Sequence, residues 1–397
     1  MKKIFALVLI LASLVPLSLG ASADLADESY SKFSGQGVTL NVYNWGQYIS
    51  DGTEDTYDTI KEFEALTGIN VVYSTYPTNE DMYAKIKSGG AQYDVIIPSD
   101  YMIGRMIEEG MLEKINFDNV PNYANIDENC RNLPFDPHNE YSVPYSTGTV
   151  VLIYNKDKVT EPVDSWNILW DEKYSGEILM FDNSRDTFAI SLKRLGYSFN
   201  TTDKAELDAA GAELLLQKPI VQAYVMDQIF DKMISGEAAL APYYSGDAIN
   251  MIKENPSLAA VVPKEGSNFF IDAMCIPKGS KNKEAAELFI NFMCEGEVAL
   301  ANAEFIEYST PNTAAFALMD EEMQTNELGY PSAEVLERTE IFLNLPAETA
   351  QQLDALWRDI KTSGVNPWIF LIILVIILVV TVVIIFIKRR NAKTVKY

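Results

Sequence analysis

The sequence has little of the chemistry that hydrolases and metal enzymes need. It contains one histidine, His138, in a loop-like stretch. Ser-His-Asp catalysis, histidine-rich metal sites and HExxH proteases all need histidine, so the sequence disfavours them. The three cysteines, Cys130, Cys275 and Cys294, are odd in number and have unpatterned spacings. They give neither a disulfide framework nor a CxxC metal site, and we expect buried free thiols. The pattern favours a binding protein without metal or cofactor over an enzyme.

Cysteine is also missing near the N-terminus, where the sequence predicts a secretory signal over residues 1–23. Two lysines precede an apolar stretch from Ile4 to Leu17, and the small-residue sequence Ala21-Ser22-Ala23 follows as a cleavage site. Export of the remaining chain follows from this pattern. Without a cysteine at that site, the lipid anchor that many surface binding proteins use is not available.

An unbroken apolar run, Trp368–Ile387, lies near the other end of the chain. At ~1.5 Å rise per residue, a helix of this run would span roughly 30 Å, the thickness of a bilayer core. Basic residues follow the run and acidic residues precede it, so the positive-inside rule predicts a cytoplasmic tail over 388–397 and residues 24–366 outside. We therefore expect a single-pass protein of the cell membrane, with its ectodomain on the extracellular or periplasmic side.

Positive charge is scarce in the predicted ectodomain. The whole chain carries a formal charge of -25, but the ectodomain keeps all 56 acidic residues and 24 of the 31 basic ones, which gives -32. Such a field repels nucleic acid and attracts cationic partners. We expect no nucleic-acid partner.

The predicted ectodomain is longer than a single core supports, so two α/β lobes are expected. Strand-like and helical patterns alternate along it, which indicates a parallel or mixed sheet with helices on both faces. The expected strands cover 38–43, 69–76, 93–97, 177–181, 239–243 and 269–276. The expected helices cover 57–66, 79–87, 185–195 and 283–294, with a further one starting at 247. Asp182 or Ser184 could cap the helix that starts at Arg185.

Ligands of open α/β sheets bind beyond the carboxyl ends of the strands. Aromatic side chains and carboxylates alternate at these positions, which suits a ligand made of methylenes that carry ammonium groups. The candidates are Trp45, Tyr48, Ser99, Tyr101, the stretch 182–186, the stretch 243–247, Phe270 and Asp272.

Eight short motifs in order resemble the spermidine/putrescine-binding proteins of polyamine ABC importers, which have the type II periplasmic-binding fold. The motifs are Tyr43-Asn44-Trp45, Tyr73-Ser74-Thr75-Tyr76, Pro98-Ser99-Asp100-Tyr101, Pro134-Phe135-Asp136-Pro137, Tyr141-Ser142-Val143-Pro144-Tyr145, Leu195-Gly196-Tyr197-Ser198, Val262-Pro263-Lys264-Glu265-Gly266 and Ser309-Thr310-Pro311-Asn312. The resemblance implies two lobes with a hinge and an interlobe cleft, lobe 1 over 38–149 and 271–316, and lobe 2 over 150–270 and 317–362. It also implies a polyamine ligand, spermidine or putrescine, and partners that are ABC permease subunits in the membrane.

The resemblance further implies which residues contact the ligand. Those implied are Trp45, Tyr48, Ser99, Tyr101, Asn183, Asp186, Tyr244, Asp247, Phe270, Asp272 and Tyr308. Asp272 matches the principal carboxylate of the family, and Asp247 matches a carboxylate of putrescine-type members. The sequence departs from the family at Gly46, Gln47, Asn183 and Phe342, which leaves the choice of polyamine open.

Other interpretations remain at this point. The same fold could hold an amino acid, an opine or a sugar, and an arginine in the cleft would favour an amino acid. Arg185 is the nearest candidate, but its place beside Asp186 favours a surface ion pair. The acids Asp182 and Asp186 could serve a glycoside hydrolase, and a membrane-bound sensor is a third class. The sequence shows no barrel repeat, which argues against a glycoside hydrolase. The predicted cytoplasmic tail leaves little room for a signalling domain, which argues against a sensor.

Overall fold

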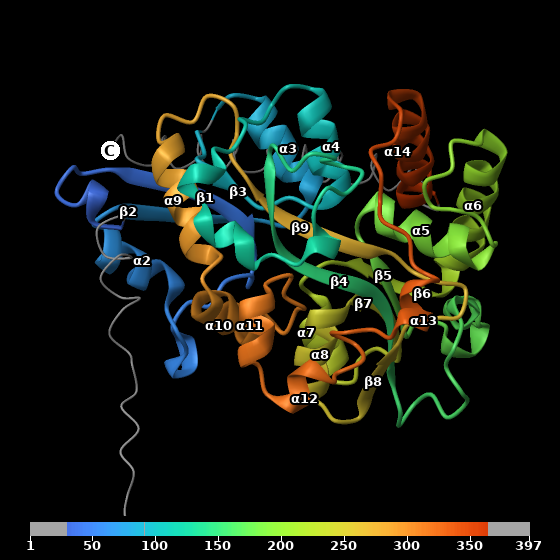
Figure 1. The fold of residues 1–397 in the computed structure, drawn as a ribbon. Helices are drawn as coiled ribbons and strands as arrows, with labels where there is room; N and C mark the ends of the chain where they lie inside the picture. Colours follow the sequence, from blue (N-terminus) through green and yellow to red (C-terminus); the bar gives the residue numbers. More distant parts are fainter. Residues whose placement is uncertain (1–29, 91, 364–397) are drawn as a thin grey trace, which may run out of the picture. The chain divides into compact units, whose positions relative to one another are not determined.

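The computed structural model describes residues 30–90 and 92–363 and divides the chain into two compact units. Unit 1 takes in the chain up to Gly148 and Phe270–Tyr330, and unit 2 takes in Thr149–Phe269 and the chain from Pro331 on. Each unit is described by itself (Figure 1). The predicted signal, membrane span and basic tail lie outside the described residues. Within those residues, no helix is long and apolar enough to cross a membrane.

Unit 1 is an α/β unit, as the alternating pattern predicts. Its strands are β1 (Thr39–Trp45), β2 (Asn70–Tyr76), β3 (Val95–Ile96) and β9 (Phe269–Cys275), whose first residue belongs to unit 2. β1 pairs in parallel with β2 and β3, and β9 is antiparallel to β3. Its α-helices are α2 (Thr59–Thr67), α3 (Asn79–Lys87), α4 (Asp100–Glu108), α9 (Lys283–Met293), α10 (Gly296–Ile306), α11 (Thr313–Leu318) and α12 (Glu321–Gln324). Short 3-10 helices cover Ser31–Phe33, Thr53–Asp55, Phe117–Asn119, Pro121–Asn125 and Glu128–Cys130.

Local sequence signals set the ends of the first helices of unit 1. The Asp58 side chain accepts a hydrogen bond from the backbone N–H of Lys61 and so caps α2, and Thr78 caps α3 in the same way. Gly68 ends α2 with a left-handed φ of 71°. A Cβ at Gly68 would stand 3.1 Å from the Cα of Ser34, so both the backbone conformation and the space favour glycine. Because α2 ends at Gly68, β2 can begin at Asn70, and the Thr78 cap then sets the start of α3.

The core of unit 1 lies between the sheet and α2 and α9. Phe63 of α2 is fully buried, and its ring lies 5.0 Å from Phe289 and 5.4 Å from Phe292 of α9. Leu40 and Val42 of β1 are buried as well. This apolar packing fixes the strands whose carboxyl ends carry the candidate residues.

Unit 2 is built around a second group of strands. They are β4 (Ser142–Asn155), which enters from unit 1, β5 (Ile178–Phe181), β6 (Val221–Val225), β7 (Leu240–Tyr244) and β8 (Leu258–Val261). β5 is parallel to β6 and β7, and β4 is antiparallel to β7 and β8. The α-helices are α5 (Ser184–Arg194), α6 (Lys204–Gln217), α7 (Ile229–Ile234), α8 (Ser245–Glu254), α13 (Ala333–Leu336) and α14 (Ala347–Thr362). The 3-10 helices η6, η7 and η8 cover Trp166–Trp170, Glu172–Tyr174 and Lys218–Ile220.

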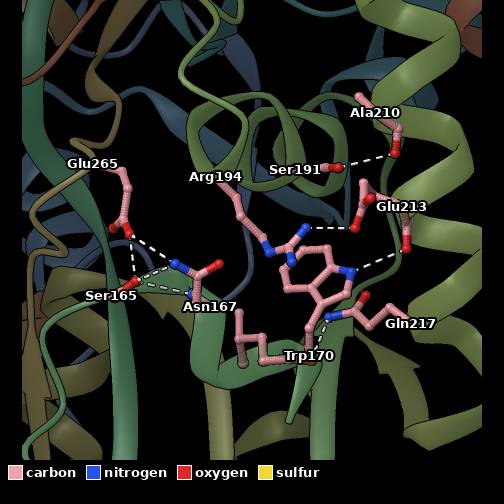
Figure 2. Close-up of polar contacts among 10 residues, drawn as sticks. Ser165, Asn167, Trp170, Ser191, Arg194, Ala210, Glu213, Gln217 and Glu265 are labelled. Carbon is pink, nitrogen blue, oxygen red and sulfur yellow. Dashed lines mark hydrogen bonds and ion pairs between the residues drawn. The ribbon is translucent and has the colours of Figure 1, made fainter.

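A polar network joins α5, α6 and η6 in unit 2 (Figure 2). The Trp170 indole N–H donates to the carbonyl of Glu213, at 3.0 Å. The Arg194 guanidinium lies over the Trp170 ring and pairs with the Glu213 carboxylate. Ser191 donates to the carbonyl of Ala210, at 2.9 Å. The network fixes α6 against its neighbours at several points along its length.

The last crossing between the units falls at 330/331, whereas the sequence placed it at 316/317. The intervening residues stay with unit 1 because Tyr330 packs back onto it. The Tyr330 ring lies 5.0 Å from the ring of Phe316, and its hydroxyl accepts from the N–H of Thr310. Ser309 also donates to the carbonyl of Gly329.

Candidate functional site

The unit 1 candidates centre on Asp272, a buried carboxylate in β9. The Tyr48 hydroxyl donates to Asp272 Oδ2 at 2.7 Å, and Tyr48 is itself buried. The Tyr145 hydroxyl donates to the backbone carbonyl of Tyr48 at 2.8 Å. These two hydrogen bonds hold the phenol of Tyr48 against the carboxylate of Asp272.

Aromatic rings pack around Tyr48 on several sides. The ring of Tyr308 lies 5.2 Å from that of Tyr48, edge to face, and the ring of Tyr145 lies 5.6 Å away in a similar arrangement. Phe270 lies 6.1 Å from Tyr308. Such edge-to-face pairs add stabilisation beyond the area that they bury. The carboxylate therefore stands beside a fixed group of rings.

The loop after β3 brings further polar groups to the same strand. Ser99 forms an isolated antiparallel bridge with Asp272, so the backbones of the two residues lie side by side. The Asn79 amide at the start of α3 donates to the hydroxyls of Ser99 and Tyr101, at 3.1 and 3.2 Å. The Tyr101 hydroxyl in turn donates to Glu80 at 2.9 Å. Ser99 and Tyr101 thus belong to one hydrogen-bonded group.

Trp45, the last residue of β1, is held by the same loop. Its indole N–H donates to the carbonyl of Ile97 at 2.8 Å, and the Tyr76 hydroxyl donates to the same carbonyl at 2.6 Å. The two rings lie 4.7 Å apart. The Asp272 cluster is the name used below for Trp45, Tyr48, Ser99, Tyr101, Phe270, Asp272 and Tyr308.

The electrostatics around Asp272 keep the phenols of Tyr48 and Tyr76 protonated. Burial, followed by the charge of Asp272, raises the pKa of Tyr48 well above its ordinary value. The same two causes, in the same order, raise the pKa of Tyr76. These tyrosines therefore act as hydrogen-bond donors at neutral pH and do not add negative charge.

The unit 2 candidates centre on Asp186, in the first turn of α5. Its carboxylate Oδ2 accepts from the Asn183 amide at 2.9 Å and from the Tyr244 hydroxyl at 2.8 Å. Asn183 is also the N-cap, because its side-chain oxygen accepts from the backbone N–H of Asp186 at 2.8 Å. The sequence placed the cap at Asp182 or Ser184, and this prediction was wrong. Asp182 instead pairs with Lys361.

Asp186 lies in surroundings that disfavour its charge. Burial raises the pKa of this carboxyl, and the hydrogen bonds from Tyr244 and Asn183 act in the opposite direction. Asp247 lies in the first turn of α8 and is half-buried, and its charge contributes, after burial, to a raised pKa of Tyr243. The Asp186 cluster is the name used below for Asn183, Asp186, Tyr244 and Asp247.

Arg185 does not lie at the surface, where the sequence suggested an ion pair with Asp186. The residue is buried, its guanidinium lies 4.5 Å from the ring centre of Phe342, and it donates to the carbonyl of Leu343 at 3.2 Å. Phe342 is buried as well and packs 4.5 Å from Phe199. The flat guanidinium stacks well on an aromatic ring, which accounts for the difference.

The predicted residues thus fall into the two clusters, each within its own unit, and their roles toward a ligand stay predictions. Sequence reasoning missed Asn79, Tyr145 and the Arg185–Phe342 pair. Tyr145 lies in a motif that was noted, but nothing in the sequence indicates that Asn79 joins Ser99 to Tyr101. Among the residues that the structure describes, no group of His, Cys, Asp and Glu side chains could hold a metal ion.

Comparison with known proteins decides the family. Residues 58–329 match the family of bacterial extracellular solute-binding proteins. The chain belongs to this family. The predicted resemblance is therefore confirmed, and so is the α/β solute-binding fold.

Curated relatives of this solute-binding protein include the spermidine/putrescine-binding periplasmic protein of Escherichia coli strain K12, which is 39% identical over 82% of the chain and 90% of the relative. A putrescine-binding periplasmic protein of Pseudomonas aeruginosa is 31% identical over 88% of the chain and 98% of the relative.

Among solved structures, the spermidine/putrescine ABC transporter substrate-binding protein of Streptococcus pneumoniae is similar, with a TM-score of 0.71 and 37% identity over 82% of this chain and 99% of that one. All three relatives are named as binding proteins, and the present chain is a binding protein rather than an enzyme.

Proposed function

We propose that this solute-binding protein captures polyamines, spermidine or putrescine, and delivers them to the permease of an ABC importer. The observation that carries the proposal is the pair of buried carboxylates, each hydrogen-bonded by a tyrosine: Asp272 by Tyr48, and Asp186 by Tyr244. The names of the relatives support the same class of ligand.

The chemistry of the clusters suits a methylene chain with ammonium groups. A charge-assisted hydrogen bond between an ammonium and a carboxylate contributes on the order of 1.5–3 kcal/mol. An aromatic face beside it adds roughly 0.5–2 kcal/mol of cation–π attraction and covers the methylenes. In this proposal the Asp272 cluster and the Asp186 cluster each offer a carboxylate to an ammonium group.

The proposal includes the membrane location that the sequence predicts. Residues 1–23 direct export, and the apolar run 368–387 anchors the ectodomain to the outer side of the cell membrane. The anchor replaces a lipid and keeps the receptor close to the permease that it serves. Flotation of the full chain with lipid vesicles tests this part.

Isothermal titration calorimetry with spermidine, putrescine and cadaverine tests the ligand. γ-Aminobutyrate serves as the control, because it has the methylene chain of a diamine but carries a carboxylate at one end. The expected result is heat with at least one polyamine and none with the control. If no polyamine binds below millimolar concentration, the ligand assignment fails.

A further inference from the structure

Two helices of unit 2, α6 and α14, run side by side in the same direction. Near their starts, the Gln352 amide donates to Asp208 of α6 at 3.0 Å. Farther along, the Leu356 side chain lies 3.5 Å from where a Cβ of Gly211 would stand. At their ends, Lys218 directly after α6 donates to the carbonyl of Ile360. The carboxyl ends of both helices therefore meet at one edge of unit 2.

Lys218 fixes the point at which the chain leaves α14. Its ammonium donates to the carbonyls of Ile360, Lys361 and Ser363, at 2.5, 3.0 and 2.6 Å. A cation that binds the last carbonyls of a helix satisfies acceptors that have no partner within the helix and offsets the negative end of its dipole. The end of α14 is thus tied to the end of α6.

The same edge carries aromatic and cationic groups. Lys361 pairs with Asp182, and its ammonium lies 4.8 Å from the ring centre of Tyr224 and 5.4 Å from that of Trp357. The two rings lie 5.4 Å apart, edge to face. Tyrosine, tryptophan and lysine are the residue types that proteins place at the level of lipid headgroups.

The last turn of α6 also exposes two neighbouring leucines. Leu216 is 71% exposed, the largest value among the exposed large hydrophobic residues of the described chain, and Leu215 is 43% exposed. The opposite side of this turn is fixed to η6, because the Gln217 amide donates to the carbonyl of Leu169 at 2.9 Å. The leucines therefore point away from the body of unit 2, from a turn whose position is fixed.

The distance to the proposed membrane anchor is short. Residues 364–367 separate Ser363 from Trp368, the first residue of the apolar run. Five Cα–Cα steps of at most ~3.6 Å span no more than about 18 Å, whatever path these residues follow. The edge at Ser363 is therefore within about 18 Å of the place where the anchor enters the bilayer.

We propose that this edge of unit 2 rests on the bilayer surface, with Leu215 and Leu216 inserted among the lipid headgroups. The inference depends on the anchor given under the proposed function and goes beyond it, because it assigns which face of unit 2 meets the lipid. Exposed leucines beside an anchored helix end bury apolar area at the interface and gain the corresponding hydrophobic free energy. The contact orients unit 2 on the membrane.

Spin labels on the full chain, reconstituted in phosphatidylcholine/phosphatidylglycerol vesicles, test the inference. A nitroxide is attached at Leu216→Cys in a Cys130→Ser background, since Cys275 and Cys294 are buried. The matched control is Ala205→Cys, an exposed position near the start of the same helix and about 16 Å away along its axis. Collision rates with a water-soluble nickel complex and with oxygen report how deep each label lies. A thermal melt checks that both variants fold like the parent protein.

The expected result is a loss of nickel collisions and a gain of oxygen collisions at 216 relative to 205. If the chain floats with the vesicles but both labels remain equally accessible to nickel, the lipid contact is wrong while the anchor stands. If the chain does not float, the anchor and the lipid contact both fail. The polyamine proposal is unaffected in either case, because calorimetry tests it separately.

Discussion

The two clusters hold their carboxylates in different ways. Asp272 lies within a strand and is approached by a tyrosine that other aromatic rings pack around. Asp186 lies in the first turn of a helix and accepts from an amide as well as from a phenol. In unit 1 burial, followed by the charge of Asp272, raises the pKa of the Tyr48 phenol, and in unit 2 burial raises the pKa of the Asp186 carboxyl itself. The comparison teaches that the same pair of residue types, a carboxylate and a tyrosine, can be held by different backbone elements and by different sets of hydrogen-bond donors.

The largest effect is expected from Asp272→Asn. An ammonium that loses its counter-charge forfeits a charge-assisted bond, so putrescine should bind about 10- to 100-fold more weakly. Titration calorimetry measures the change. Asp118→Asn, which neutralises an exposed acid of unit 1, is the matched control. An affinity close to that of the parent protein would mean that no ammonium binds at Asp272.

Asp186→Asn should have a smaller effect at neutral pH, about tenfold, because burial already opposes the charge that the substitution removes. The sign of the pH dependence follows from the raised pKa. As the pH falls through that pKa, Asp186 takes up a proton, loses its attraction for the cation, and affinity falls by at most about one decade per pH unit. Calorimetry over a pH series should show this loss in the parent protein and less of it in Asp186→Asn. Equal slopes in both proteins would assign the titration to another group.

The tyrosine donors can be compared by removing only their hydroxyls. Tyr48→Phe and Tyr244→Phe keep the rings, and each should weaken putrescine binding by about 3- to 10-fold, the equivalent of roughly 1 kcal/mol. The loss should be smaller for Tyr244→Phe because Asp186 retains the amide of Asn183. A larger loss for Tyr244→Phe than for Tyr48→Phe would show that the Asn183 amide does not compensate for the missing hydroxyl at Asp186.

The smallest effect concerns the cap of α5. Asn183→Ala removes a hydrogen bond to the helix N-terminus and should lower the free energy of unfolding by about 0.5–2 kcal/mol. Urea unfolding measures it. Asp182→Ala removes a partly exposed ion pair with Lys361 and should cost less, since such pairs contribute little. A larger loss for Asp182→Ala would contradict the assignment of the cap to Asn183.

The sequence located both clusters through the ends of predicted strands. The predicted helix over 79–87 has the same bounds as α3, and the one that starts at 283 corresponds to α9. Both have clear apolar periodicity or a clear glycine stop, so local pattern was sufficient. The strand ends then selected Trp45 and Ser99 because parallel neighbours end at the same edge. Asp272 does not follow this rule, because it lies within β9, which is antiparallel to β3.

Contacts between residues that lie far apart in the chain could not be predicted from the sequence. The long strand β4 was not predicted, and a proline and a glycine at 144 and 148 interrupt its pattern. The burial of Arg185 depends on Phe342, which lies far along the chain and contacts it only in the folded unit. The return of Tyr330 to unit 1 likewise depends on ring packing rather than on any local signal.

The central claim is the proposal that this protein binds polyamines by pairing their ammonium groups with its buried carboxylates. The most direct test compares putrescine with butylamine, which has the same number of carbons but a single ammonium. In calorimetry of the parent protein, putrescine should bind at least about tenfold more tightly, because butylamine can use only one charge-assisted bond. Equal affinities for the two amines would contradict the account.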